Sequence, residues 1–270
     1  MKARGFRVGF VMLVLTNAIN TFAMDIGLPG PMPGGGKMSL ELFCEDYERD
    51  IRQEISQPWS PGTLHGGALV AQDMTQEETR YFARLTYALR RELALQALVG
   101  FTRSEGADND SPVWGLGIQY LVWSCHGFDT TLFAAGQYVN EIKYKHEFYY
   151  GPNPPYPNNW EWPEGIQKED YYELSGGAMM SRDFQFRSRW TLRPYAGLQL
   201  SKLDGNEKYD HTWAIVEPLG REVQEGYIRD DGLLTLFGGA GLFWNNRFGL
   251  RLEGRFVNQT SFSAGGVYFF

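Results

Sequence analysis

Residues 93–103, LALQALVGFTR, alternate between strongly apolar and less apolar side chains. Successive side chains of an extended strand point to opposite sides, so the two sets fall on opposite faces. The odd positions hold Leu93, Leu95, Ala97, Val99 and Phe101, and the even positions include Ala94, Gln96, Gly100 and Thr102. The first face suits lipid and the second suits a polar interior.

The same alternation recurs along the chain, and in several segments the less apolar face carries charges. In 248–256, apolar residues alternate with Arg251, Glu253 and Arg255. Charges at every second position fit a barrel with lipid outside and a hydrated or salt-bridged lumen. The charges expected in the lumen are Arg84, Arg193, Arg251, Glu253 and Arg255, together with Glu141 and Glu173.

The sequence therefore predicts an all-β, antiparallel transmembrane barrel of about ten strands, with eight as the alternative. The expected strands are 38–52, 79–89, 92–103, 113–123, 130–144, 170–182, 190–202, 232–244, 248–257 and 261–270. Between them, short connections alternate with the long stretches 53–78, 104–112, 145–169 and 203–231. Because bacterial outer-membrane barrels have short periplasmic turns and longer external loops, the long stretches are expected to face outward from the cell.

The N-terminal 23 residues have the features of a Sec signal peptide. Lys2, Arg4 and Arg7 precede an apolar stretch over 8–15, and Thr21-Phe22-Ala23 forms a cleavage site. We expect a signal peptide over 1–23, a flexible segment over 24–37 and the barrel over 38–270. The formal net charge of −7 becomes more negative once the leader is removed, which argues against a nucleic-acid partner.

The C-terminal residues 263–270, SAGGVYFF, continue the alternation to the end of the chain. The outward face of the last strand would hold Phe262, Ala264, Gly266, Tyr268 and Phe270. This pattern resembles the C-terminal assembly signal of the bacterial outer-membrane β-barrel domain family, and the resemblance covers roughly 38–270. It implies recognition by the barrel-assembly machinery, contact with outer-membrane lipid, and location in the outer membrane of a Gram-negative-type bacterium.

No constellation of residues predicts an enzyme. The nearest match to the omptin proteases, which are ten-stranded barrels, is Tyr209-Asp210-His211, but adjacent residues on a strand point to opposite faces. Asp108 and Asp110 have alternate spacing within a Gly/Asp/Asn turn and are interpreted as solvated. We expect no catalytic residue, no cofactor and no metal site.

The two cysteines, Cys44 and Cys125, are expected to remain free. Both are placed toward the periplasmic side of the predicted barrel, but several strands apart around the wall. A disulfide needs Cα atoms within about 7 Å of each other. The expected state is a monomer without an intramolecular bridge.

The long stretch 145–169 contains a Pro-rich core surrounded by aromatic residues. The residues are Tyr149, Tyr150, Tyr156, Trp160 and Trp162. One hypothesis is an external contact surface for glycans or another protein, because rigid aromatic side chains give large contact area at low entropic cost. The other is that Tyr149 and Tyr150 belong to the interfacial girdle and the remainder caps the lumen.

These patterns favour a non-enzymatic outer-membrane barrel with a structural or surface-interaction role. The alternative is a narrow pore or small-solute channel, followed by a surface enzyme of omptin-like or lipid A-modifying type. Eight strands are just filled by side chains, and open channels appear near 16 to 18 strands. A lumen of about ten strands that contains long Arg and Glu side chains is therefore expected to be closed.

Overall fold

The computed structural model describes residues 38–56, 69–147, 164–186, 189–213, 220–230, 233–257 and 259–270. The predicted signal peptide, the lead-in segment and all five aromatic residues of the third long stretch lie outside these ranges. In the described part of the chain, no helix is long and apolar enough to cross a membrane.

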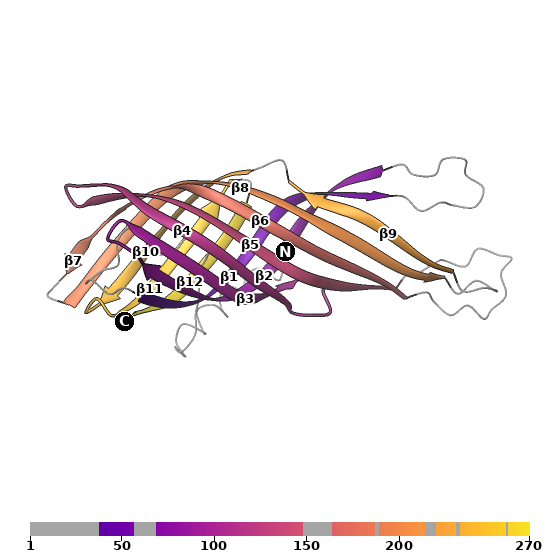
Figure 1. The fold of residues 1–270 in the computed structure, drawn as a ribbon, viewed down its shortest axis with the longest axis horizontal. Coiled ribbons are helices and arrows are strands. Elements are labelled where there is room, and N and C mark those ends of the chain that lie inside the picture. Colours follow the sequence, from indigo (N-terminus) through magenta and orange to yellow (C-terminus); the bar gives the residue numbers. More distant parts are fainter. Residues whose placement is uncertain are drawn as a thin grey trace, which may run out of the picture.

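Antiparallel strands form the whole described structure. They are β1 (Met38–Ser56), β2 (Leu69–Ala88), β3 (Leu93–Ser104), β4 (Ser111–Cys125), β5 (Phe128–Glu147), β6 (Glu164–Arg182), β7 (Phe184–Phe186), β8 (Trp190–Trp213), β9 (Gly220–Arg229), β10 (Leu233–Trp244), β11 (Phe248–Phe256) and β12 (Gln259–Phe269). Ten of them close a ring in the order β1-β2-β3-β4-β5-β6-β8-β10-β11-β12, and β12 pairs back with β1 (Figure 1). The predicted antiparallel barrel is confirmed.

Three hairpins, β1–β2, β5–β6 and β8–β9, extend the wall well beyond the predicted strands (Figure 1). We call this side the long-hairpin end and the opposite side the short-turn end. The stretches 53–78, 145–169 and 203–231 were expected to be loops, and for the parts now found in strands that expectation was wrong. Strands that leave the lipid carry polar residues on both faces, so apolar alternation no longer marks them.

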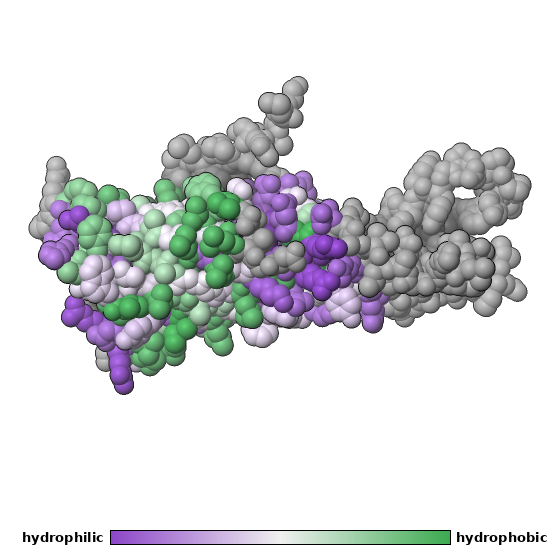
Figure 2. All heavy atoms as spheres, turned by 90° about the horizontal axis from the view of Figure 1, so that it is seen from above, coloured by the Kyte–Doolittle hydropathy of each residue, from purple (hydrophilic) through white to green (hydrophobic). Residues whose placement is uncertain are grey.

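A band of outward apolar side chains surrounds the barrel toward its short-turn end (Figure 2). Aromatic rings mark the edge of this band at the short-turn end. There, the residues that lie directly opposite each other on successive strands are Phe186, Trp190, Trp244, Phe248 and Tyr268. Toward the long-hairpin end, the Tyr81 and Phe101 rings stack at 5.0 Å. Aromatic rings favour the two membrane–water interfaces, so these rows indicate where the lipid begins and ends.

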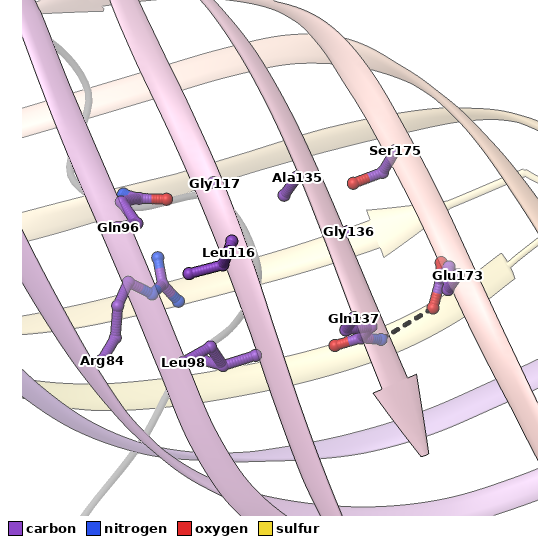
Figure 3. Close-up of a pocket in the computed structure, with 10 residues that line it drawn as sticks. All are labelled: Arg84, Gln96, Leu98, Leu116, Gly117, Ala135, Gly136, Gln137, Glu173 and Ser175. Carbon is purple, nitrogen blue, oxygen red and sulfur yellow. Dashed lines mark hydrogen bonds between the residues drawn. The ribbon is translucent and has the colours of Figure 1, made fainter.

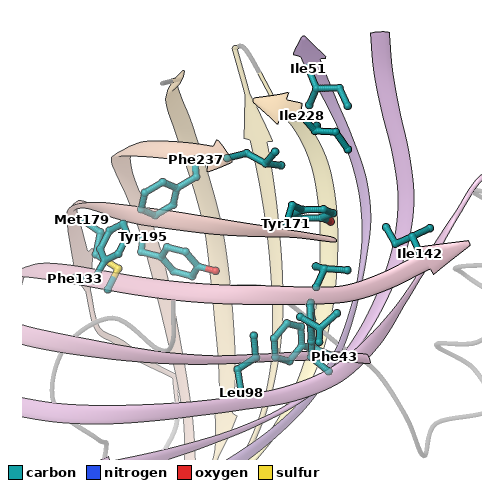
Figure 4. Packing of buried hydrophobic residues seen from close by; sticks show 14 residues of the cluster. Phe43, Ile51, Leu98, Phe133, Ile142, Tyr171, Met179, Tyr195, Ile228 and Phe237 are labelled. Atoms are coloured by element: carbon teal, nitrogen blue, oxygen red, sulfur yellow. The ribbon is translucent and has the colours of Figure 1, made fainter. Parts of the chain in front are cut away.

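Inward-facing apolar side chains, among them the rings of Phe133, Phe237 and Tyr195, pack together inside the barrel (Figure 4). The Phe133 and Phe237 ring centroids lie 6.0 Å apart, in an edge-to-face arrangement. A Cβ atom on Gly177 would lie 2.7 Å from Cζ of Phe133 and 2.0 Å from the carbonyl oxygen of Leu198. Glycine at this position therefore lets the Phe133 ring cross close to the wall.

Glu141 is not in the lumen, contrary to the sequence reading. The β5–β6 register shifts between Val139 and Ile142, and Glu141 adopts a φ of 53° at this bulge. Its carboxylate lies 2.5 Å from Nζ of Lys143 and 3.2 Å from Nζ of Lys168, with 42% of the side chain exposed. A bulge inserts one extra residue and so reverses the face on which later residues fall.

The last strand presents the predicted pattern to lipid. Phe262, Tyr268 and Phe270 are exposed on the outer face, whereas Ala264 is covered by its neighbours. The N–H of Phe270 donates to the carbonyl of Met38 at 3.0 Å, which joins the end of the chain to the first strand. The aromatic terminus therefore lies at the seam of the ring.

Replacing Phe270 with serine is expected to lower the amount of assembled barrel, measured as the heat-modifiable band on a gel. The matched control is Phe256→Ser, because Phe256 on β11 is exposed to 60% and Phe270 to 62%. Both variants lose the same lipid contact, but only the first alters the terminal signal. Equal assembly of the two variants would refute a special role for the terminus.

Candidate functional site

The barrel interior is crossed by charged side chains. Among the described residues, six buried arginines and eight buried carboxylates point into it. They are Arg49, Arg80, Arg84, Arg193, Arg251 and Arg255, with Glu41, Glu45, Glu78, Glu169, Glu173, Glu207, Glu253 and Asp230. Buried charges are costly unless they are paired, so their mutual contacts decide whether the interior is closed or open to solutes.

The group nearest the short-turn end links side chains from four strands of the barrel. The Glu41 carboxylate lies 3.7 Å from a terminal nitrogen of Arg84 and 3.2 Å from one of Arg251. The Tyr195 hydroxyl donates to Glu253 at 2.7 Å. Strands β1, β2, β8 and β11 are thereby tied together across the lumen.

Arg80 is at the centre of a second group, farther toward the long-hairpin end. Its Nε donates to Glu78 at 2.7 Å, and its Nη1 lies 3.7 Å from Glu45 and 3.6 Å from Glu173. The guanidinium also stacks 3.5 Å from the centroid of the Tyr47 ring. One guanidinium thus compensates carboxylates from three strands, which is the planar, multidentate role that arginine fills best.

Arg49 completes this second group. Its Nη1 donates to Glu173 at 2.8 Å, and its Nη2 donates to Asp230. Asp230 also accepts the N–H of Leu203 at 3.0 Å. The side chains of β1, β6 and the β9–β10 junction therefore meet in the middle of the lumen.

A small cavity of about 20 Å³ remains between these groups (Figure 3). Its lining includes Arg84, Gln96, Gln137 and Glu173, and Nε2 of Gln137 donates to Glu173 at 2.9 Å. This volume holds about one water molecule. In the described residues, the part of the interior around this cavity is occupied by a network of buried side chains.

The carboxylates of Glu169 and Glu207 lie closer to the long-hairpin end, in the part of the wall beyond the lipid band. Nε2 of Gln167 donates to Oε1 of Glu169 and to Oε1 of Glu207, both at 2.5 Å. The residues before and after Glu169 on β6, Lys168 and Asp170, face the outer surface, so this stretch is beyond the lipid. Burial, and then the nearby charge of Glu207, raise the pKa of Glu169 to about 8.

The predicted lumen charges Arg84, Arg193, Arg251, Glu253 and Arg255 all lie inside the ring and are buried. Arg193 is held by Asp183, whose Oδ2 accepts from Nη2 at 2.6 Å. The sequence reading missed Arg49, Arg80, Glu78, Glu169 and Glu207. Arg49 and Arg80 lie in the expected strands 38–52 and 79–89, whereas Glu78, Glu169 and Glu207 lie in the long stretches, where the available signal was that polar residues continue at alternate positions.

The candidate protease residues do not form a described site. Asp110 is exposed and accepts from Nε of Arg103 at 2.6 Å, and Asp108 lies in the exposed β3–β4 turn. Asp210 and His211 occupy consecutive positions of β8, opposite Ile166 and Gly165 in an unbroken ladder. Among the described residues, no group of three His, Cys, Asp or Glu side chains could hold a metal ion.

Both cysteines are free in the structure. Cys44 lies on β1 opposite Ala264 and Tyr81, on the outward face of the wall. Cys125 ends β4, and its sulfur lies 2.8 Å from Nδ1 of His126 in the turn to β5. Strands β2 and β3 separate the two thiols around the ring.

No family model matches this chain, and no curated protein matches it in sequence. Among solved structures it is similar to the outer membrane protease OmpT from Escherichia coli, at 10% identity and a TM-score of 0.51, with 90% of this chain and 99% of that chain covered. The translocator domain of the autotransporter NalP from Neisseria meningitidis matches at 11% identity and a TM-score of 0.35, over 99% of this chain and 95% of that one. The chain has the fold of an outer-membrane β-barrel protein.

Proposed function

We propose that this chain is a non-enzymatic barrel of the bacterial outer membrane, reached by Sec export, with a structural or surface-interaction role. The observation that carries the proposal is the filled interior, where Arg49 and Arg80 bind carboxylates from several strands and the cavity holds about 20 Å³. A barrel closed in this way is suited to hold its long hairpins at the surface rather than to pass solutes. The long-hairpin end then faces outside the cell.

The purified, folded protein in a planar lipid bilayer is expected to show no stable open conductance of general-porin size. The physical reason is that a permeating ion would have to break the Arg80 and Arg49 contacts in a low-dielectric interior. A general porin prepared and reconstituted in the same way serves as the positive control. Steady, large single-channel steps from this chain would overturn the proposal in favour of the pore alternative.

The surface-interaction role is tested on the third long stretch, whose aromatic residues prompted it. Exchanging residues 148–163 for a short turn is expected to leave assembly unchanged and to abolish binding to glycan arrays or protein ligands bound by the intact barrel. The OmpT structure is described as a protease, so the enzyme alternative is tested in parallel on peptide substrates. Peptide cleavage that Asp210→Ala or His211→Ala abolishes would refute the non-enzymatic role.

A further inference from the structure

Exposed arginines gather at the short-turn end of the barrel. They come from the β2–β3 turn, the end of β6, the residue before β8 and the β10–β11 turn, and they are Arg90, Arg91, Arg182, Arg189 and Arg247. None of them forms an ion pair with another described residue. The carboxylates described at this end are Glu92, Asp129 and Asp183, and Asp183 already holds Arg193. The short-turn end is therefore a basic surface on a chain whose formal net charge is −7.

Exposed cations toward the long-hairpin end differ from these arginines, because almost all of them are paired within the chain. Seven of them lie within 3.6 Å of a carboxylate oxygen, and they are Arg52, Arg103, Lys143, Lys168, Lys202, Lys208 and Arg229. Lys145 is the exception among the side chains described there. At the short-turn end, by contrast, the anions that compensate the guanidinium groups have to come from outside the described chain.

Two of the short-turn arginines lie beside the aromatic edge of the lipid band. Arg189 directly precedes Trp190 and Arg247 directly precedes Phe248, and both aromatic residues belong to the row at this edge. The two segments are in contact, because the N–H of Asn245 donates to the carbonyl of Arg189 at 2.6 Å. Hydrophilic side chains border the apolar band at this end (Figure 2). Aromatic rings favour the level of the lipid headgroups, so the neighbouring guanidinium groups are positioned to meet headgroup phosphates.

Arg182 is oriented by two aromatic rings. Its Cζ lies 4.6 Å from the ring centroid of Phe128 and 5.1 Å from that of Phe184. Such stacking uses the faces of the guanidinium group, whereas phosphate is bound by the N–H groups along its edge. Apart from His126, each exposed basic residue described at this end is an arginine. Arginine matches phosphate in a bidentate way, which the point charge of lysine does not.

We propose that the arginines of the short-turn end bind the headgroup phosphates of anionic phospholipids in the leaflet that this end contacts. Arg182, Arg189 and Arg247 supply guanidinium groups beside the aromatic edge, and Arg90 and Arg91 extend the basic surface to the β2–β3 turn. Complementary charge together with a position at the interface favours a lipid headgroup over a soluble macromolecule. The inference rests on the proposed function only in naming this leaflet the periplasmic one.

The test measures which lipid surrounds the full-length protein, through quenching of its tryptophan fluorescence by brominated lipids. Trp190 and Trp244 lie at the short-turn edge of the lipid band and are 42% and 45% exposed. The folded protein is reconstituted in vesicles of phosphatidylcholine and phosphatidylglycerol, in which one lipid or the other carries bromine. The wild type should prefer phosphatidylglycerol by about fivefold, which is the effect of one arginine near an anionic headgroup.

A variant that combines Arg182→Gln, Arg189→Gln and Arg247→Gln should lose this preference. Arg103→Gln is the matched control and should keep it, because Arg103 is an exposed arginine of the long-hairpin end that is paired with Asp110. If the combined variant does not assemble, the salt dependence of the wild type decides the question. High salt should weaken its preference, because exposed charges are screened.

Equal quenching by the two brominated lipids around the wild type would overturn the proposal, as would an equal loss of preference in Arg103→Gln. Inorganic phosphate should have no more effect than sodium chloride of the same ionic strength, since a specific effect would mean that the site takes a free anion instead. Retention by purified peptidoglycan without a lipid preference would overturn the proposal in favour of a polymer. Open conductance with the lipid preference intact would refute only the closed barrel.

Discussion

Arg80→Met is expected to destabilise the folded barrel by about 3–5 kcal/mol, the range for removing one partner of a buried ion pair. Arg80 is completely buried, and its guanidinium is shared by Glu78, Glu45 and Glu173. Methionine fills similar space but carries no charge. The carboxylates would then be left in the interior without their main cation, which is the origin of the cost.

The free energy of unfolding is measured by urea titration in phospholipid vesicles, with tryptophan fluorescence as the signal. The control is Arg103→Met, because Arg103 also pairs with a carboxylate, Asp110 at 2.6 Å, but its side chain is 64% exposed. An exposed pair contributes about 1 kcal/mol or less. If both variants lose the same stability, the interior network does not hold the barrel together.

Glu169→Gln is expected to stabilise the barrel at alkaline pH and to flatten its pH dependence. The folded pKa of Glu169 is about 8, against an ordinary value of 4.5, because burial and the Glu207 charge favour its protonated form. Between these two values the folded state holds a proton that the unfolded state has lost. Stability therefore falls as pH rises through this window, by up to about 1.4 kcal/mol per pH unit, and levels off above it.

The measurement is the urea midpoint of wild type and variant at pH 5 and at pH 9. The difference between the proteins should be small at pH 5 and large at pH 9, since glutamine cannot ionise. Glu141→Gln is the control, because hydrogen bonds from Lys143 and Lys168 lower the pKa of Glu141, so its contribution to stability changes only below pH 4.5 and its difference from wild type should be the same at pH 5 and at pH 9. A Glu169→Gln variant with the wild-type pH dependence would show that the Glu169–Glu207 pair is ionised without cost.

The sequence was sufficient to predict the ring itself, because lipid imposes a strict period of two on every strand that it contacts. Segments such as 93–103 and 248–256 therefore reveal their strands, and 248–256 also reveals its inward charges. Near the long-hairpin end, the strands could not be predicted in the same way, because water contacts one of their faces and polar side chains contact the other. These strands are β1, β2, β5, β6 and β8. Their ladders depend on partners far away in the sequence.

The interior contacts were predictable in kind but not in detail. Alternation assigns Arg251 and Arg255 to the lumen, but only the shear of the ring decides that Arg80 meets Glu173 across it. Glu141 shows the limit of such counting, because one bulged residue changes the face of its neighbours. A bulge depends on how two strands fit together, and a single strand's sequence does not record that fit.

The ring is closed by the first and last strands of the chain, from Ser39↔Phe269 to Arg49↔Gln259. Most of the described chain lies between these two strands in sequence, so the ring closes only when its two most distant strands meet. Closure is thus the pairing with the greatest loop entropy, and loops of this size make folding slow. Loss of the terminal strand alone would therefore open the ring and leave two unpaired strand edges in the lipid.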